Sequence, residues 1–199
     1  MRYSVLTIER EYASGGSEIG RMVAARRKIP CYGNEVLRMA AQQIGIAPEN
    51  VEHLDETAPN SLLYSLAAMA RPITFGDTTQ PQENILQHKE AEVIWRFAAK
   101  DSCVLIGRRA GAILKDNADV LRVFIHANNA YRKKRAIESY GVPADEAESV
   151  LKRYDRRRAN YYNFYSAHRW DDKAAYHLML DSSSLGPERC AEIILAAME

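Results

Sequence analysis

Cysteine is scarce in this chain of 199 residues, which has only Cys31, Cys103 and Cys190. They lie far apart, their number is odd and no two form a CxxC pair, a pattern unlike a disulfide framework or a cysteine zinc site. Each lies among apolar residues, which predicts buried free thiols in a reducing compartment, with a catalytic thiol as the alternative. The five histidines also lack metal-ligand spacing.

The chain also lacks an excess of charge of either sign. It has 27 lysines and arginines against 26 aspartates and glutamates, which gives a net charge of +1 at pH 7. Proteins that bind nucleic acid or an anionic membrane through bulk electrostatics carry a marked basic excess. We therefore expect neither partner, and any anion site must come from a local cluster of basic residues.

Long apolar runs are missing as well. The longest, near residues 62–70, is interrupted by Ser65 and is too short to span a bilayer. The first residues lack the apolar stretch of a signal peptide. These features predict a cytoplasmic protein. An apolar content of 47% with 27% charged residues is ordinary for a globular domain.

What the sequence does contain is an alternation of short apolar runs with longer amphipathic segments. The apolar runs predict strands at about 3–8, 29–32, 102–106, 120–126 and 178–180. Helices are predicted at about 17–28, 34–45, 48–56, 60–70, 83–100, 128–139, 143–164 and 187–198, with a loop at 71–82. Apolar strands alternating with helices are typical of an α/β fold whose parallel sheet is covered on both faces.

The stretch 9–20, EREYASGGSEIG, joins the first predicted strand to the first predicted helix. A phosphate-binding loop needs glycine for a tight turn, inward-pointing amides and an immediate helix start. The pattern G-x-x-x-x-G-K-[ST] puts Arg10 at its first glycine, Gly15 at its second, Gly16 at its lysine and Ser17 at its last position. The serine that would hold Mg²⁺ is present, but the lysine is absent. The stretch is either a phosphate cradle or a plain strand–turn–helix connection.

A pair of arginines follows the predicted strand 102–106, in the sequence CVLIGRRAGAIL. In open parallel sheets, ligands bind beyond the carboxyl ends of the strands. Arg108 and Arg109 are there in a position to hold a phosphate through bidentate contacts. The alternative is a surface turn with solvated arginines.

A basic segment, LKRYDRRRANYYNFY, lies within the predicted helix 143–164. At helical spacing Asp155 and Arg158 share one face, as do Arg153 and Arg157. The segment is open to three interpretations: a solvated helix face, a nucleic-acid patch with interleaved tyrosines, or a lid that supplies arginines to a transferring phosphoryl group. The neutral overall charge speaks against the nucleic-acid patch.

These three sites, in this order, resemble the cytidylate kinase family of nucleoside monophosphate kinases, and more closely its cytidylate kinase-like bacterial branch. The resemblance covers about residues 3–197. Its motifs are TIEREYASGGSEIG, CVLIGRRAGAILKDNADVLRVFIHA, RYDRRRANYYNFY and YHLMLDSSSLGPERCAEII. It implies one domain with a three-layer P-loop kinase fold, in which a parallel sheet is flanked by helices. The implied parts are a core at about 1–32, 84–140 and 174–199, a helical monophosphate-binding insert at about 33–83 and a helical lid at about 141–173.

The resemblance also implies roles for particular residues. The residues implied to bind the nucleotide are Ala13, Ser14, Gly15, Gly16, Ser17, Glu18 and Arg132, and Ser17 would also hold the metal. Those implied to bind the acceptor are Arg108, Arg109 and Glu35. The catalytic lid residues would be Arg153, Asp155, Arg157 and Arg158. Asp155 and Arg158 match the Asp-x-x-Arg pattern of the family's lid, which implies that they engage the acceptor phosphate. Asp181-Ser182 matches the Asp-Ser/Thr pair before the last helix.

Three departures from the family pattern matter for function. Gly16 replaces the loop lysine, a loss shared by the kinase-like branch, and Ser17 stands where that branch often has a basic residue. Arg109 replaces the aspartate of the Gly-Arg-Asp segment, which bears on cytosine recognition. Gly33 stands where the branch usually has an acidic residue, and Glu35 is the acid that remains nearby.

The resemblance predicts an ATP- and Mg²⁺-dependent kinase that acts on a nucleoside monophosphate such as CMP or dCMP, or on a related small acceptor. Phosphoryl transfer needs mainly alignment and positive charge on the phosphoryl oxygens. A missing lysine removes one such charge, a loss of about 10²–10³ in rate by analogy with oxyanion contacts. The alternative is a regulatory protein that binds nucleotide without turning it over. Oligomeric state is not predicted.

Overall fold

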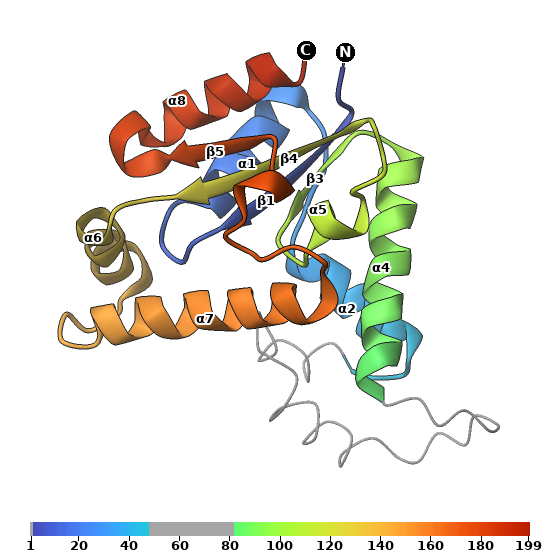
Figure 1. Cartoon of the computed structure of the whole chain (residues 1–199), viewed down its shortest axis with the longest axis horizontal. Helices are drawn as coiled ribbons and strands as arrows, with labels where there is room; N and C mark the ends of the chain where they lie inside the picture. The colour runs from blue at the N-terminus through green and yellow to red at the C-terminus, as the bar shows by residue number, and fades with distance from the viewer. Residues whose placement is uncertain (1, 48–81) are drawn as a thin grey trace.

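The strands predicted from the apolar runs form one parallel sheet (Figure 1). The computed structural model describes residues 2–47 and 82–199. Its strands are β1 (Val5–Arg10), β2 (Cys31–Tyr32), β3 (Cys103–Ile106), β4 (Val120–His126) and β5 (Leu178–Asp181). Their order is β2-β3-β1-β4-β5, and each neighbouring pair is parallel. The expected α/β fold with a parallel sheet is therefore confirmed.

The helices of the described residues follow the predicted order, with differences in two short helices and two helix starts. They are α1 (Gly16–Arg27), α2 (Asn34–Gln43), α4 (Gln82–Lys100), α5 (Ala110–Ile113), α6 (Asn129–Tyr140), α7 (Ala147–Tyr165), the 3₁₀ helix η3 (Lys173–Ala175) and α8 (Ser182–Ala197). The short helices α5 and η3 were not predicted. Helix α7 begins four residues after the predicted 143, and α8 begins five residues before the predicted 187, with a kink at Gly186 (φ 77°). The predicted helices 48–56 and 60–70 lie outside the described residues, as does the predicted loop 71–82 except for Gln82, which begins α4.

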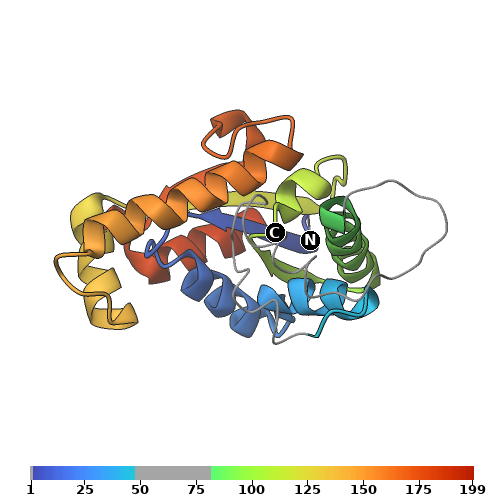
Figure 2. The ribbon, with the colours of Figure 1, turned by 90° about the horizontal axis from the view of Figure 1, so that it is seen from below.

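The sheet forms the middle of three layers (Figure 2). Side chains alternate across a strand, so Leu6 and Ile8 point to one face and Val5 to the other. Helices α1 and α8 cover the first face, whereas α4 and α5 cover the second. The side chains of β1 and β3 are buried on both faces, as expected for inner strands of a parallel sheet, whereas those of the edge strands β2 and β5 are mostly only partly buried.

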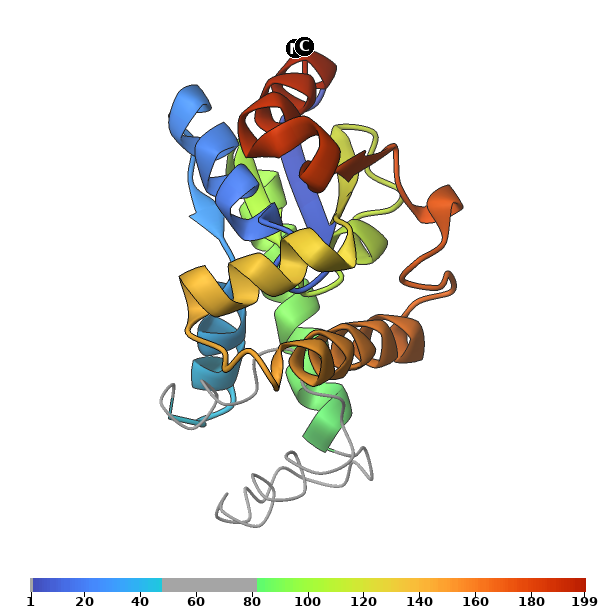
Figure 3. The same ribbon diagram turned by 90° about the vertical axis from the view of Figure 1, so that its left-hand side faces the viewer.

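Two further helices, α6 and α7, lie next to each other beyond the carboxyl ends of β1 and β4 (Figure 3). Tyr162 in the last part of α7 is buried with Phe124 of β4 and Trp170. This packing anchors α7 at the edge of the sheet where ligands of such folds bind. Within residues 2–47 and 82–199, no helix combines the length and apolarity needed to cross a membrane.

Candidate phosphate-binding site

The carboxyl ends of four strands meet at the loop that follows β1. The Glu11 amide donates to the Ile125 carbonyl of β4 (3.0 Å), and the Gly107 amide after β3 donates to the Ile8 carbonyl (2.9 Å). After β5, the Ser182 hydroxyl lies within hydrogen-bond distance of the carbonyls of Ser14 and His126. These contacts hold the loop at the carboxyl ends of the strands, where ligand binding is predicted.

The loop itself turns through two left-handed residues, Ala13 (φ 60°) and Gly15 (φ 84°). The amide and hydroxyl of Ser14 both donate to the Glu11 carbonyl, at 3.3 and 2.9 Å, which tightens the turn. Gly15 is the N-cap of α1, and no side chain forms a capping hydrogen bond there. A helix start without a side-chain cap presents amides and the positive end of its dipole to an anion.

Gly16 is the first residue of α1 and lies against Arg10. A Cβ at position 16 would be 2.5 Å from the Arg10 Cβ and 3.2 Å from the Ile125 Cβ. Arg10 is 9% exposed, and its Nε donates to the Ser17 hydroxyl at 3.3 Å. Arg10, Gly15, Ser17 and Arg158 help to line a cavity of about 230 Å³ beside the loop.

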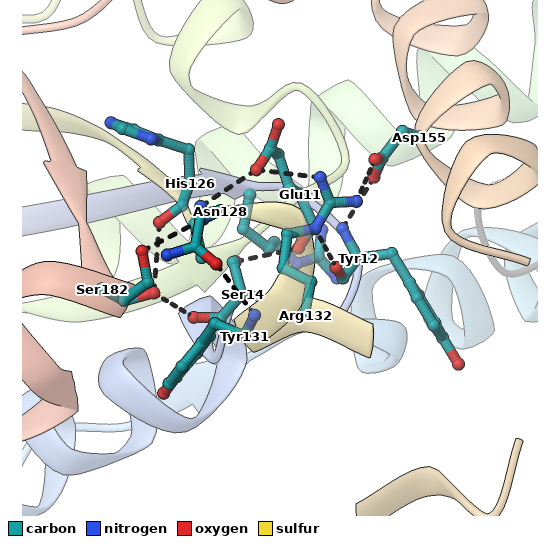
Figure 4. Close-up of polar contacts among 12 residues, drawn as sticks. Glu11, Tyr12, Ser14, His126, Asn128, Tyr131, Arg132, Asp155 and Ser182 are labelled. Carbon is teal, nitrogen blue, oxygen red and sulfur yellow. Dashed lines mark hydrogen bonds and ion pairs between the residues drawn. The ribbon is translucent and has the colours of Figure 1, made fainter. Parts of the chain in front are cut away.

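A buried arginine ties the loop to α6 and α7 (Figure 4). The Arg132 guanidinium donates to the Tyr12 carbonyl (2.8 Å), forms an ion pair with Glu11 (3.1 Å) and pairs closely with Asp155. Asp155 in turn accepts the Tyr12 amide proton at 2.7 Å, while Glu11 accepts that of Ala127 at 3.0 Å. Arg132, from the nucleotide-binding set, and Asp155, from the lid set, thus meet at the backbone of the loop.

The remaining lid residues divide into two groups. Arg158 reaches the loop directly, because its guanidinium donates to the Arg10 carbonyl at 2.9 Å. Arg153 and Arg157 lie instead 5.7 and 5.6 Å from the ring centroid of Tyr154, which stacks on Tyr12 of the loop at 4.4 Å. The two arginines are therefore one aromatic layer away from the loop.

Arg135 adds another cation to the rim of the loop. Its guanidinium donates to Glu18 at 2.7 Å, and it lies 3.7 Å from a Cβ built at Gly15. Its Nε is buried without a hydrogen-bond partner. A buried donor beside an uncapped helix start is chemically suited to an anionic ligand.

Arg108 and Arg109 form a second polar cluster at the end of β3, and both have left-handed φ angles (57° and 48°). Arg108 is 6% exposed, lies 3.7 Å from the Glu90 carboxylate of α4 and donates to Asn34 of α2 at 3.2 Å. The Tyr161 hydroxyl of α7 donates to the same carboxylate. Burial raises the pKa of Tyr161, which keeps this hydroxyl protonated as a donor.

Arg109 joins α4 to the end of α7. Its guanidinium donates to Gln87 at 3.0 Å and to the Tyr165 carbonyl at 3.2 Å, and it stacks 4.6 Å from the Tyr165 ring centroid. It also lines a second cavity of about 260 Å³, together with Arg122. The two predicted acceptor arginines are thus buried and held by hydrogen bonds and an ion pair, unlike the solvated arginines of a surface turn.

The other predicted residues are placed near helix starts. The Glu35 carboxylate accepts the Gly33 amide proton at 2.7 Å at the start of α2. Asp181 accepts the Ser183 amide proton at 2.9 Å and caps α8. Hydrogen bonds from the hydroxyl groups of Ser183 and Ser184 lower the pKa of Asp181 to about 2. Ser17 is the expected metal ligand, and the described ranges contain no group of three or more His, Cys, Asp or Glu side chains suited to a metal.

Four residues at these sites were not among the predicted site residues: Arg10, Glu11, Arg135 and Glu90. For Arg10 and Glu11 a signal existed, because they lie inside the aligned loop pattern. Glu90 gave none, since a charged residue in an amphipathic helix normally indicates a solvated face. Its side chain is nevertheless completely buried.

Residues 5–184 match the sequence model of the cytidylate kinase-like family. Two proteins named cytidylate kinase, from Thermococcus kodakarensis and Pyrococcus abyssi, are each 34% identical over 104 residues, or 51% of this chain. Those matches cover 52% and 56% of the relatives, so the chain spans about half the length of the known kinases that it matches.

Solved structures with a similar fold include kinases. An uncharacterized protein from Eubacterium ventriosum has a TM-score of 0.73 at 22% identity, over 98% of this chain and 97% of its own. A gluconokinase from Sinorhizobium meliloti has a TM-score of 0.55 at 14% identity, over 100% and 93%. A shikimate kinase from Bacteroides thetaiotaomicron has a TM-score of 0.55 at 10% identity, over 98% and 97%. The expected P-loop kinase fold is confirmed.

Proposed function

Since the chain belongs to the cytidylate kinase-like family, we propose that it transfers a phosphoryl group from ATP to a nucleoside monophosphate of the CMP or dCMP kind, or to a related small acceptor. The observation that carries this proposal is the loop after β1, which presents an uncapped helix start and a cavity of about 230 Å³ lined by Arg10 and Arg158. Its chemistry suits a chain of phosphates.

ATP and Mg²⁺ fit the donors available at this loop. We propose that Ala13 to Glu18 hold the phosphates through backbone amides other than that of Ser14, which donates to the Glu11 carbonyl. Arg132 fixes the loop backbone that carries these amides. Ser17 offers one oxygen, which suits Mg²⁺ because this ion usually keeps several waters and takes few protein ligands. Mg²⁺ would neutralise charge on the transferring phosphoryl group.

On the acceptor side, we propose that Arg108 and Arg109 bind the monophosphate. Glu90 and Gln87 hold their guanidinium groups at the end of β3, so little ordering would be needed on binding. In the lid, Arg158 reaches the loop carbonyl and is the residue best placed to approach the donor phosphates. Arg153 and Arg157 remain proposed lid cations, and Glu35 remains a proposed acceptor residue.

A second candidate function rests on Gly16. This position cannot carry a lysine without displacing Arg10, so the loop lacks the charge that a lysine there would place on the transferring phosphoryl group. In this second function, the protein would bind nucleotide and act as a regulator without transferring phosphate. The two functions share the donor site but differ in turnover. In both, the protein acts on small nucleotides.

The test is phosphoryl transfer to a panel of acceptors. The purified protein is incubated with ATP, Mg²⁺ and each of CMP, dCMP, UMP, AMP and GMP, and ADP release is followed by a coupled assay. Release that depends on one monophosphate supports the kinase. ATP binding without release for any acceptor supports the regulator, and absence of ATP binding contradicts both.

A further inference from the structure

Positions 10 and 16 compete for the same space. A Cβ at position 16 would lie 2.5 Å from the Arg10 Cβ and 3.0 Å from the Arg10 Cγ. These are the stem atoms of the arginine, which cannot swing away as the end of a flexible side chain can. Only a residue without a Cβ fits at position 16 while Arg10 is present. Gly16 is therefore required as long as position 10 carries a side chain.

The same two positions are special in the phosphate-loop pattern. In G-x-x-x-x-G-K-[ST], the first glycine aligns with Arg10 and the lysine aligns with Gly16. Compared with this pattern, the cation stands at the end of β1 instead of the start of α1, and the glycine stands at the start of α1 instead of the end of β1. The loop as a whole keeps one cation.

Arg10 is also placed where such a cation is useful. Its side chain is 9% exposed and lines the cavity beside the loop with Gly15, Ser17 and Arg158. Its Nε donates to the Ser17 hydroxyl at 3.3 Å, which holds the guanidinium beside the start of α1. Arg158 donates to the Arg10 carbonyl at 2.9 Å and fixes the backbone from which the side chain starts.

We propose that Arg10 supplies the phosphate-contacting cation that the lysine at the position of Gly16 supplies in other phosphate loops. The proposal rests on the proposed function, because it requires a nucleotide di- or triphosphate in this cavity. A guanidinium stays charged at all working pH values and can donate two parallel hydrogen bonds to phosphate oxygens.

The test exchanges the two residues. The variants are Arg10→Gln, Arg10→Lys, Gly16→Lys and the double variant R10G/G16K, which restores the usual pattern. Arg21→Gln removes one exposed arginine from α1 and serves as the charge-matched control. Calorimetry gives Kd for MgATP and for inorganic tripolyphosphate, which lacks the nucleoside. The melting temperature without ligand reports whether each variant folds.

Arg10→Gln should weaken binding of both ligands by about 10- to 150-fold, the loss expected for one hydrogen-bonded charge. Gly16→Lys should bind as weakly and melt at a lower temperature because of the collision. R10G/G16K should bind at least tenfold more tightly than either Arg10→Gln or Gly16→Lys, since only the tight contact with the Ile125 Cβ remains. Arg10→Lys should bind more tightly than Arg10→Gln, and Arg21→Gln should match the wild type.

Two results would contradict the role of Arg10 while leaving the proposed function intact. In the first, the wild-type protein binds MgATP and the Kd of Arg10→Gln is within threefold of the wild-type Kd. In the second, a folded R10G/G16K binds MgATP no more tightly than the single variants. If R10G/G16K does not fold, the comparison of Arg10→Lys with Arg10→Gln decides, and equal binding contradicts the proposal. Wild-type protein that binds neither ligand contradicts the proposed function itself.

Discussion

The contact between Asp155 and the loop should make a large contribution to stability. Asp155 accepts the Tyr12 amide proton at 2.7 Å and pairs with Arg132, whose side chain is 5% exposed. Breaking a buried ion pair by removing one partner typically costs about 3–5 kcal/mol. Arg132 would keep Glu11 at 3.1 Å and the Tyr12 carbonyl at 2.8 Å, so the cost here should be smaller.

We expect Asp155→Ala to lower the free energy of unfolding by about 2–3 kcal/mol, which in a chain of this size is a fall in Tm of about 4–12 °C. Asp155→Asn keeps an oxygen for the Tyr12 amide and should lose about 1–2 kcal/mol. Asp171→Asn is the matched control, because it breaks only an exposed pair with Arg169, worth about 0–1 kcal/mol.

Urea unfolding followed by circular dichroism measures these differences. A double-mutant cycle with Arg132→Gln should give a coupling energy of about 1–3 kcal/mol. The reasoning is refuted if Asp155→Ala is within about 0.5 kcal/mol of the wild type, or if the cycle shows no coupling. Either result would mean that α7 is not held to the loop through this carboxylate.

Three further predictions concern the titratable side chains of Glu90, His177 and Cys31. Glu90→Gln removes the fully buried carboxylate beside Arg108 and should cost about 3 kcal/mol in urea unfolding; a loss below about 1 kcal/mol contradicts the pairing. Partial desolvation and the nearby charges of Arg122 and Arg2 lower the pKa of His177, although this residue is exposed. The unfolded chain therefore takes up this proton first, and stability should fall as the pH drops below about 6.5. His177→Asn should reduce this pH dependence, and a folded pKa at or above about 6.5 by NMR contradicts it. Cys103 and Cys190 are buried as predicted, whereas Cys31 is only partly buried. Partial burial still raises the pKa of Cys31 to about 11, so a thiol reagent at pH 8 should label it slowly in the native protein and fast in urea; equal rates contradict this prediction.

The sequence predicted the sheet well because its signal is local. The run 120–126 is apolar and β-branched, and it coincides with β4. The four residues of α5 escaped prediction because they are too short for a helical period. The left-handed turn at Arg108 and Arg109 has no local signal either, since such angles are favoured by glycine rather than arginine.

The sequence predicted many of the residues at the site but not the contacts between them. The Asp-x-x-Arg pattern of Asp155 and Arg158 indicated a lid, yet only the folded chain brings that carboxylate to the Tyr12 amide, 143 residues away. Contact with the acceptor phosphate stays a prediction for both residues. Gly16 was interpreted as a lost lysine, because a sequence does not give the distance to Arg10 that makes this glycine necessary.

The central claim is that the loop after β1 binds the phosphates of a nucleotide without a lysine at position 16. Calorimetric titration of the wild-type protein with ATP, in the presence of Mg²⁺, tests it most directly. We predict saturable binding with one site per chain, displaced by inorganic tripolyphosphate. A flat titration at millimolar ATP, from protein whose melting temperature shows that it is folded, would contradict the account.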